Sequence, residues 1–459
     1  MNAEQALSIT STAPWNPFDS ENEQRAFLFF QDQTTPQLAE FHGCELWTHV
    51  ILQAVHADSG TRHAVIALAL LHEQFQQTGE PRIGASDAVA KHYSLAIQSH
   101  LENLAHGKQR AGNVEFYLIS CILFFCIETL QGHSASALSL LRRAVSLLQE
   151  LHQNAQRQSA WSLEVFENLL CRLQAQAIGL VGPRAFPTTV PPRIKAASIP
   201  DMPDRFASID QAKEYLEYYR QSHDLTQSTN ELSDLHSQSP RIILQYRDTI
   251  LQWSAAFNAL QRALHKDSLS YQNRRALIML TIHQRFLILS MEIAVKYPQI
   301  TTDESLWDHF HQIYSEVVDL AESVMRLPLS DASGADRLSY EKPVFTLDFG
   351  IIVPLYDVVR QCRDPGIRSR AIALLRKHPR REGFLDSSFV AHVLERIVEL
   401  EHGAAQRNVT VASDVPASAR ICFVVPTFNM AEQAMEVSYY RRSDPTQAQA
   451  SLVFREFVK

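Results

Sequence analysis

The stretch VEFYLISCILFFCIETLQ, residues 114–131, is apolar on nearly every face of the helix that it predicts. A helix that is hydrophobic all round lies either in a large core or in a membrane. Spanning a bilayer takes about 20 apolar residues, whereas the apolar part here runs only from Phe116 to Ile127, between Glu115 and Glu128. We therefore predict a buried core helix, around which the other helices of the chain pack.

The composition is that of a globular protein. Of the 459 residues, 46% are hydrophobic and 20% are charged, and only 14 are glycine. Scarce glycine argues against a phosphate-cradling α/β enzyme and favours a mostly helical chain. The formal net charge of −8 gives no general attraction for nucleic acid.

The cysteines are scattered and show neither zinc-site nor disulfide-framework spacing. They are Cys44, Cys121, Cys126, Cys171, Cys362 and Cys422. The N-terminus has no basic segment followed by an apolar one, so no signal peptide is expected. These features indicate a reducing compartment, the nucleus or alternatively the cytoplasm, and no membrane association.

Helical periodicity dominates the chain. The amphipathic segments 87–104 and 134–151 each follow a more hydrophobic helix, which is typical of helical hairpins stacked side by side. We predict an all-α, multi-helix bundle of stacked helical hairpins with a short β-hairpin-like C-terminal tail. Residues 345–364 are expected to form a helix that is kinked at Pro354.

The predicted organisation has three parts. Residues 1–17 are rich in Ser, Thr, Ala and Pro and are expected to be disordered. Residues 18–405 form the helical part, which no convincing boundary divides. In the extension 406–459, two β-rich stretches near 420–425 and 435–442 predict the hairpin.

No catalytic or metal motif is complete. The chain lacks a glycine-rich nucleotide loop, a P-loop, a nucleophile elbow and a His-Glu-x-x-His pair. His72-Glu73 begins the last of these, but position 76 is Gln, so His72 is expected to make an ordinary hydrogen bond. His309 and His311 stand two apart and do not share a helix face. We expect no catalytic residues, no metal and no cofactor.

A basic run between Arg360 and Arg381 contains eight cations against the single acid Asp364. It is a candidate for contacting phosphate or an acidic partner, and the alternative is a solvated helix face. The candidate residues are Arg368, Arg370, Arg376, Lys377, Arg380 and Arg381.

Several segments, in this order, resemble the regulatory domain of fungal zinc-cluster (six-cysteine) transcription factors. They include WTHVILQA (47–54), RHAVIALALLHE (62–73), LFFCIETLQGH (123–133), DFGIIVPLY (348–356) and PRREGFLDS (379–387). The resemblance covers roughly residues 18–445. It implies a helical, non-catalytic regulatory module that works in the nucleus, often as a dimer, on metabolic or secondary-metabolite genes.

The family's zinc cluster needs six closely spaced cysteines, which these 459 residues do not contain. Direct sequence-specific DNA contact is therefore not expected from this chain, which is either a regulator that lost its DNA-binding arm or a truncated gene product. We predict that it acts through protein partners or a small effector, as a homodimer or paired with a full-length relative. The alternative is a biosynthetic enzyme or small-molecule-binding protein with a cavity lined by His92, Tyr93 and the aromatic residues of 116–125.

Overall fold

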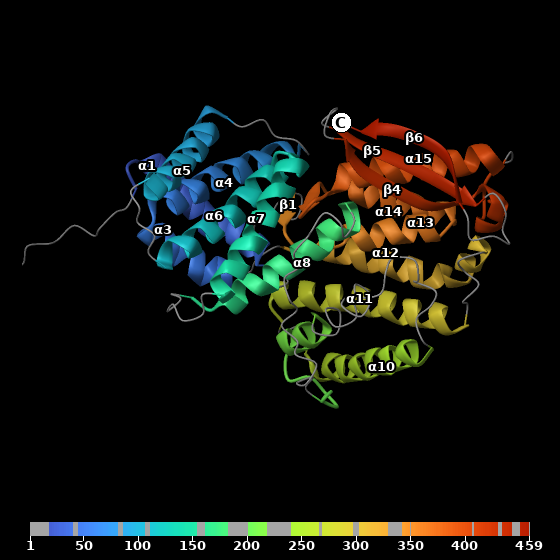
Figure 1. Ribbon diagram of the computed structural model, residues 1–459. Helices are drawn as coiled ribbons and strands as arrows, with labels where there is room; N and C mark the ends of the chain where they lie inside the picture. The colour runs from blue at the N-terminus through green and yellow to red at the C-terminus, as the bar shows by residue number, and fades with distance from the viewer. Residues whose placement is uncertain are drawn as a thin grey trace, which may run out of the picture.

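The computed structural model confirms a helical protein with a small sheet near its C-terminus (Figure 1). It describes residues 18–39, 45–80, 86–105, 111–153, 161–181, 201–217, 240–265, 269–296, 303–328, 342–348, 350–405, 408–429, 434–442 and 450–458. The expected disorder of residues 1–17 lies outside these ranges.

The first half of the chain builds one hydrophobic core. Its elements are α1 (Glu21–Phe29), η1 (Phe30–Thr34), α2 (Thr35–Leu38), η2 (Leu46–Val50), α3 (Ile51–Ala57), α4 (Ser59–Thr78), α5 (Asp87–Ala105), α6 (Ala111–Leu130), α7 (Ser134–Gln153) and α8 (Leu163–Val181). The predicted core helix is α6, and its side chains from Leu118 to Leu130 are largely buried. Helix α4 pairs with α5 and α6 with α7, so the predicted helical hairpins are confirmed.

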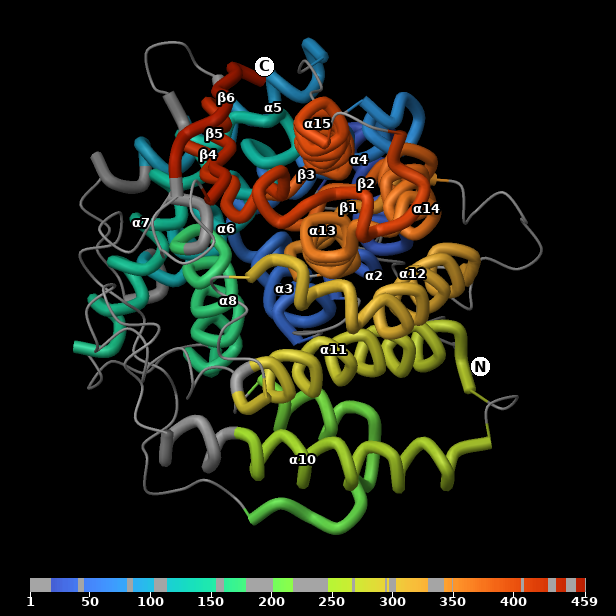
Figure 2. Tube along the Cα trace, turned by 90° about the vertical axis from the view of Figure 1, so that its right-hand side faces the viewer, coloured from blue at the N-terminus to red at the C-terminus, as the bar shows by residue number. Residues whose placement is uncertain are grey.

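The second half builds a separate hydrophobic core. It comprises a helical segment at 209–217, α10 (Pro240–Ala263), α11 (Tyr271–Lys296), η6 (Glu304–Phe310), α12 (His311–Met325), α13 (Ile352–Gln361), α14 (Pro365–Lys377) and α15 (Ser387–Ala405). Figure 2 shows α10, α11 and α12 in successive layers, with α13 to α15 beyond them. Over Tyr271–Ile293, helix α11 is long and apolar enough to cross a bilayer; 39% of that span is buried, and the helix contacts α10 and α12.

Two small sheets complete the described fold. In the first, β1 (Val344–Thr346) pairs in parallel with β2 (Arg380–Glu382), which pairs antiparallel with β3 (Leu385–Asp386). In the second, β4 (Ile421–Asn429), β5 (Ala434–Arg442) and β6 (Ala450–Val458) form an antiparallel meander in that order. Strands β4 and β5 confirm the predicted hairpin. The third strand, β6, was not predicted.

The prediction of one kinked helix over residues 345–364 is wrong. Strand β1 occupies its first part, and α13 begins only at Ile352. Pro354 lies in the first turn of α13, where a helix needs no backbone N–H donor, so the proline causes no break there. The Glu382 carboxylate accepts the N–H groups of Gly350, Ile351 and Ile352 at 2.9–3.1 Å and thereby caps this helix.

Strand β1 joins the two cores. Phe345 and Leu347 belong to the first core, although the chain from Ile351 onward belongs to the second. The Phe345 N–H donates to the Gln37 side chain at 2.8 Å. The Gln176 amide donates to the Leu347 carbonyl at 2.8 Å, and the Arg381 guanidinium donates to the Thr129 carbonyl at 2.6 Å. We call this contact region, made of β1 and these hydrogen bonds, the seam.

Candidate effector pocket

The structure does not bring the six candidate basic side chains to one surface. Arg368, Arg380 and Arg381 are buried, with ion-pair distances of 2.7 Å to Glu401, 2.6 Å to Glu382 and 3.1 Å to Asp386, respectively. The exposed members are Arg370, paired with Asp319 at 2.6 Å, Arg376, paired with Glu395 at 2.5 Å, and Lys377. The prediction that all six residues form one surface patch is therefore wrong, because three of them are buried and pair with acids inside the fold. Partner contact by the exposed three stays a prediction.

Arg368 of α14 belongs to a larger buried charge cluster. Glu401 of α15 lies 3.2 Å from Arg363 and 2.7 Å from Arg368, and Arg363 also reaches Glu304 at 3.3 Å. Burial opposes ionisation of Glu401, but the two guanidinium groups outweigh it and lower the pKa of this carboxyl. The ionised cluster ties α13, α14, α15 and η6 together.

A second arm of the cluster reaches the C-terminal sheet. Arg420, at the start of β4, donates to the Asp308 carboxylate at 2.6 Å and to the Glu304 carbonyl at 2.7 Å. Arg363 donates to the Ile421 carbonyl at 3.1 Å. A shift of the short helix η6 would therefore displace the start of β4 through these contacts.

A pocket of about 230 Å³ opens beside η6, between α11 and α13. It is lined by His283, Phe286, Leu289, Ser290, Ile293, Trp307, Val353, Pro354, Asp357 and Gln361. Apolar and aromatic walls with a few convergent polar groups are the usual composition of a small-molecule site. The volume is below the usual range of roughly 300–1,000 Å³, so the pocket suits a small ligand.

Two polar side chains in the pocket wall differ in their accessibility. The Trp307 Nε1–H is buried and has no hydrogen-bond partner among the described residues, and such a donor is costly to leave unpaired. Burial raises the pKa of Asp357, while Arg360, 3.9 Å away, opposes that change. The Asp357 side chain still keeps 31% of its surface exposed. The indole nitrogen is shielded from the open pocket, so Asp357 is the polar group that a ligand with a hydrogen-bond donor would meet directly.

The cavity expected around His92 and Tyr93 takes a different form. The Tyr93 hydroxyl donates to Glu128 at 2.6 Å, and its ring packs edge-on against Phe124. Phe124 and Phe125 are buried in the first core, and Phe116 packs against Trp161. These aromatic side chains therefore pack against one another and do not line the pocket described above.

The pocket was missed by sequence reasoning because its residues come from three separate segments. His283 lies on α11, Trp307 on η6 and Asp357 on α13. No short spacing connects them. The only local hints are a tryptophan among acidic residues and a lone aspartate on an apolar helix.

Comparisons with known proteins point to regulation. Residues 26–175 match the family described as the fungal specific transcription factor domain. Over an alignment that covers 88% of this chain and 77% of the relative, the sequence is 24% identical to the aspercryptin biosynthesis cluster-specific transcription regulator of Emericella nidulans. No solved structure matches the chain significantly.

The matched range corresponds to a structural unit. It begins in α1 and ends in α8, and the first hydrophobic core extends from Ala26 to Ala177 before β1 joins it. The similarity to the regulator extends far beyond this range. Together the two matches support a regulatory role and point away from an enzyme.

Proposed function

We propose that this chain is a nuclear regulator of metabolic or secondary-metabolite genes that acts through protein partners and a small effector. The observation that carries the proposal is the similarity, over most of both chains, to a transcription regulator of a biosynthesis cluster. The match of the first core to the fungal specific transcription factor domain supports it independently.

DNA contact is assigned to a partner. The 459 residues contain no block of six closely spaced cysteines that would form a zinc cluster. We therefore assign DNA reading to a zinc cluster that lies outside these residues, on a relative that pairs with the helical body.

The effector is assigned to the pocket between α11, η6 and α13. A small molecule with an amine or hydroxyl donor for Asp357 and an apolar part against the Trp307 ring fits its chemistry. Binding would hold η6 against α13. Because Glu304 and Asp308 of η6 contact Arg363 and Arg420, the bound state would bias the position of β4 and of the sheet that follows.

Transcript analysis after deletion of the gene in its host tests the regulatory role. We expect a group of biosynthetic genes to change several-fold and to recover when the wild-type gene is restored. Unchanged transcripts, together with a tagged protein found only outside the nucleus, would contradict the proposal. Unchanged transcripts with a lost metabolite would favour the alternative of a pathway enzyme or binding protein.

The effector pocket is tested in the same strain. Asp357→Asn keeps the shape of the side chain and removes its charge, whereas Trp307→Phe keeps an aromatic wall but makes it smaller. We expect both variants to accumulate normally and to restore the transcripts poorly. Asp248→Asn, at an exposed side chain paired with Arg247, is the matched control and should restore them fully. Full recovery by all three variants would remove the pocket from the mechanism.

A further inference from the structure

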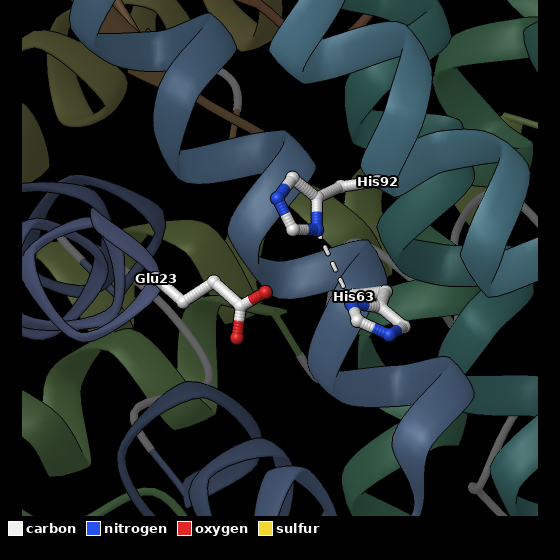
Figure 3. Close-up of side chains that lie close together, drawn as sticks. All are labelled: Glu23, His63 and His92. Atoms are coloured by element: carbon white, nitrogen blue, oxygen red, sulfur yellow. Dashed lines mark hydrogen bonds between the residues drawn. The ribbon is translucent and has the colours of Figure 1, made fainter. Parts of the chain in front are cut away.

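Three side chains that come from separate helices of the first core converge at its edge (Figure 3). They are Glu23 of α1, His63 of α4 and His92 of α5, and one ligand atom from each lies within 4.8 Å of the others. From this geometry we propose a site for a divalent transition metal ion, Zn²⁺ in the first instance, that joins α1 to the α4–α5 hairpin.

The two imidazoles already stand at ligand spacing. Their Nδ1 atoms are 3.2 Å apart and share a hydrogen bond, which an ion bound between them would replace (Figure 3). Two nitrogens bound to one zinc at about 2.0–2.1 Å, in tetrahedral geometry, lie roughly 3.4 Å from each other. The pair therefore needs only a small adjustment to accept the ion, whereas the carboxylate must move closer.

The carboxylate is positioned by the start of α1. Ser20 caps this helix by accepting the Glu23 N–H, and the Asp19 N–H donates to Glu23 Oε2 at 2.9 Å. This arrangement resembles a capping box, except that Glu23 accepts the N–H of Asp19 in place of that of the N-cap Ser20, and it restricts the Glu23 side chain. In Figure 3 the Glu23 carboxylate points toward the two rings.

The charges around the site come from both signs. Metal binding requires neutral imidazole nitrogens. The carboxylates of Glu23 and Asp19 favour a cation there, while the nearby Arg62 and Lys91 oppose it. The carboxylate ligand supplies the charge that a neutral pair of imidazoles lacks.

Nitrogen and oxygen donors favour zinc over calcium or magnesium. Three protein ligands leave a fourth position, and because His63 is only partly buried, water can reach it. The ion would fix α1, which already buries Ala26 and Phe27, against the hairpin. The metal would therefore set how the N-terminal helix is held on the first core.

Metal titration of the purified 459-residue chain tests the proposal, with Zn²⁺ alone and with Co²⁺ as a spectroscopic substitute. We expect one equivalent of tight binding and the visible absorption of tetrahedral Co²⁺ without thiolate charge-transfer bands. His63→Ala and His92→Ala should each weaken binding by about tenfold or more. Glu23→Gln, which preserves the shape of the side chain, should also weaken it.

His311→Ala is the matched control, because this exposed histidine of α12 lies outside the cluster. It should bind the ion as the wild type does, and circular dichroism should show that all four variants are folded. Zn²⁺ should also slow hydrogen exchange in α1 of the wild type but not of His63→Ala. Failure of the wild type to bind one equivalent, or unchanged binding by both histidine variants, would overturn the proposal.

Discussion

At the scale of single residues, the buried carboxylate of Glu401 shows why the basic run was misinterpreted. The acids that neutralise Arg363 and Arg368 come from positions 304 and 401, far away in sequence. Glu401→Ala would leave Arg368 buried without its acid and Arg363 with Glu304 alone, which costs about 3–5 kcal/mol. Urea denaturation should show this loss of unfolding free energy.

Glu395→Ala provides the comparison for that measurement. Glu395 and Arg376 form an exposed pair, with 39% and 42% of their side chains accessible, so its removal should cost less than about 1 kcal/mol. Similar losses for the two variants would mean that the buried cluster contributes no more than a surface ion pair.

His72 makes the stability of the protein depend on pH. Its Nδ1 is hydrogen-bonded to the Thr34 hydroxyl at 2.9 Å, which agrees with the ordinary hydrogen bond expected from the sequence. Burial lowers the pKa of His72 to about 3. In the unfolded chain its pKa is about 6.5. Below pH 6.5 the unfolded state binds a proton at this histidine and the folded state does not. The unfolding free energy therefore decreases as the pH is lowered from 6.5 to 3.

Replacing the ring isolates this effect. His72→Asn retains a polar atom near Thr34 but does not titrate. From pH 7.5 to pH 5.5 the wild type should lose about 1.4 kcal/mol more unfolding free energy than the variant. His63, His92 and His100 contribute equally to both proteins and cancel. Parallel pH profiles from urea denaturation would contradict the assignment.

At the scale of elements, the turn between β2 and β3 requires glycine. Gly383 has φ +57°, and a Cβ atom there would collide with the side-chain amide of Gln176, which holds the seam through the Leu347 carbonyl. Gly383→Ala should therefore destabilise the protein by about 1–3 kcal/mol, measured by thermal or urea unfolding.

Gly403 is the contrasting glycine. It lies in α15, and no atom stands within 4 Å of a Cβ built on it. Gly403→Ala should stabilise the protein by about 0.4–1 kcal/mol, because alanine loses less conformational freedom on folding. An equal loss of unfolding free energy in both alanine variants would show that the turn between β2 and β3 does not require glycine at position 383.

The elements also show what the sequence could predict. Helices such as α4, α6 and α7 have long apolar patterns, and local periodicity was enough to find them. Strand β6 was missed because a register shift near Tyr439 and Tyr440 breaks its alternation, which leaves Leu452 and Val453 both exposed. The pocket and the Glu23, His63 and His92 cluster each combine three distant segments, and only the tertiary fold brings those together.

At the scale of the whole molecule, the arrangement around a single core helix was only half right. Helix α6 is buried as predicted, but it organises the first core alone, and a second core forms around α11 to α15. A single hydrophobic core stops growing beyond about 250–300 residues. A helical body of this length therefore divides its apolar residues between two cores, and the seam determines whether they behave as one unit.

The seam predicts cooperative unfolding of the two cores. Phe345 is fully buried in the first core against His72, and its N–H bonds Gln37. Phe345→Ala should lower the unfolding free energy by about 3–5 kcal/mol, because packing at this contact is lost, and it should uncouple the two cores. In the wild type, α4 and α11 should lose hydrogen-exchange protection at the same urea concentration. In the variant, they should lose it at two different concentrations.

Phe257→Ala separates uncoupling from plain destabilisation. Phe257 is equally buried but stacks on Trp253 inside the second core, away from the seam. Its removal should lower the midpoint of one shared transition, because the contacts between the cores remain. A single transition in Phe345→Ala, or two transitions already in the wild type, would show that β1 does not couple the cores. Coupling through β1 is what would let a signal in the second core, such as a ligand beside Trp307, reach helices of the first.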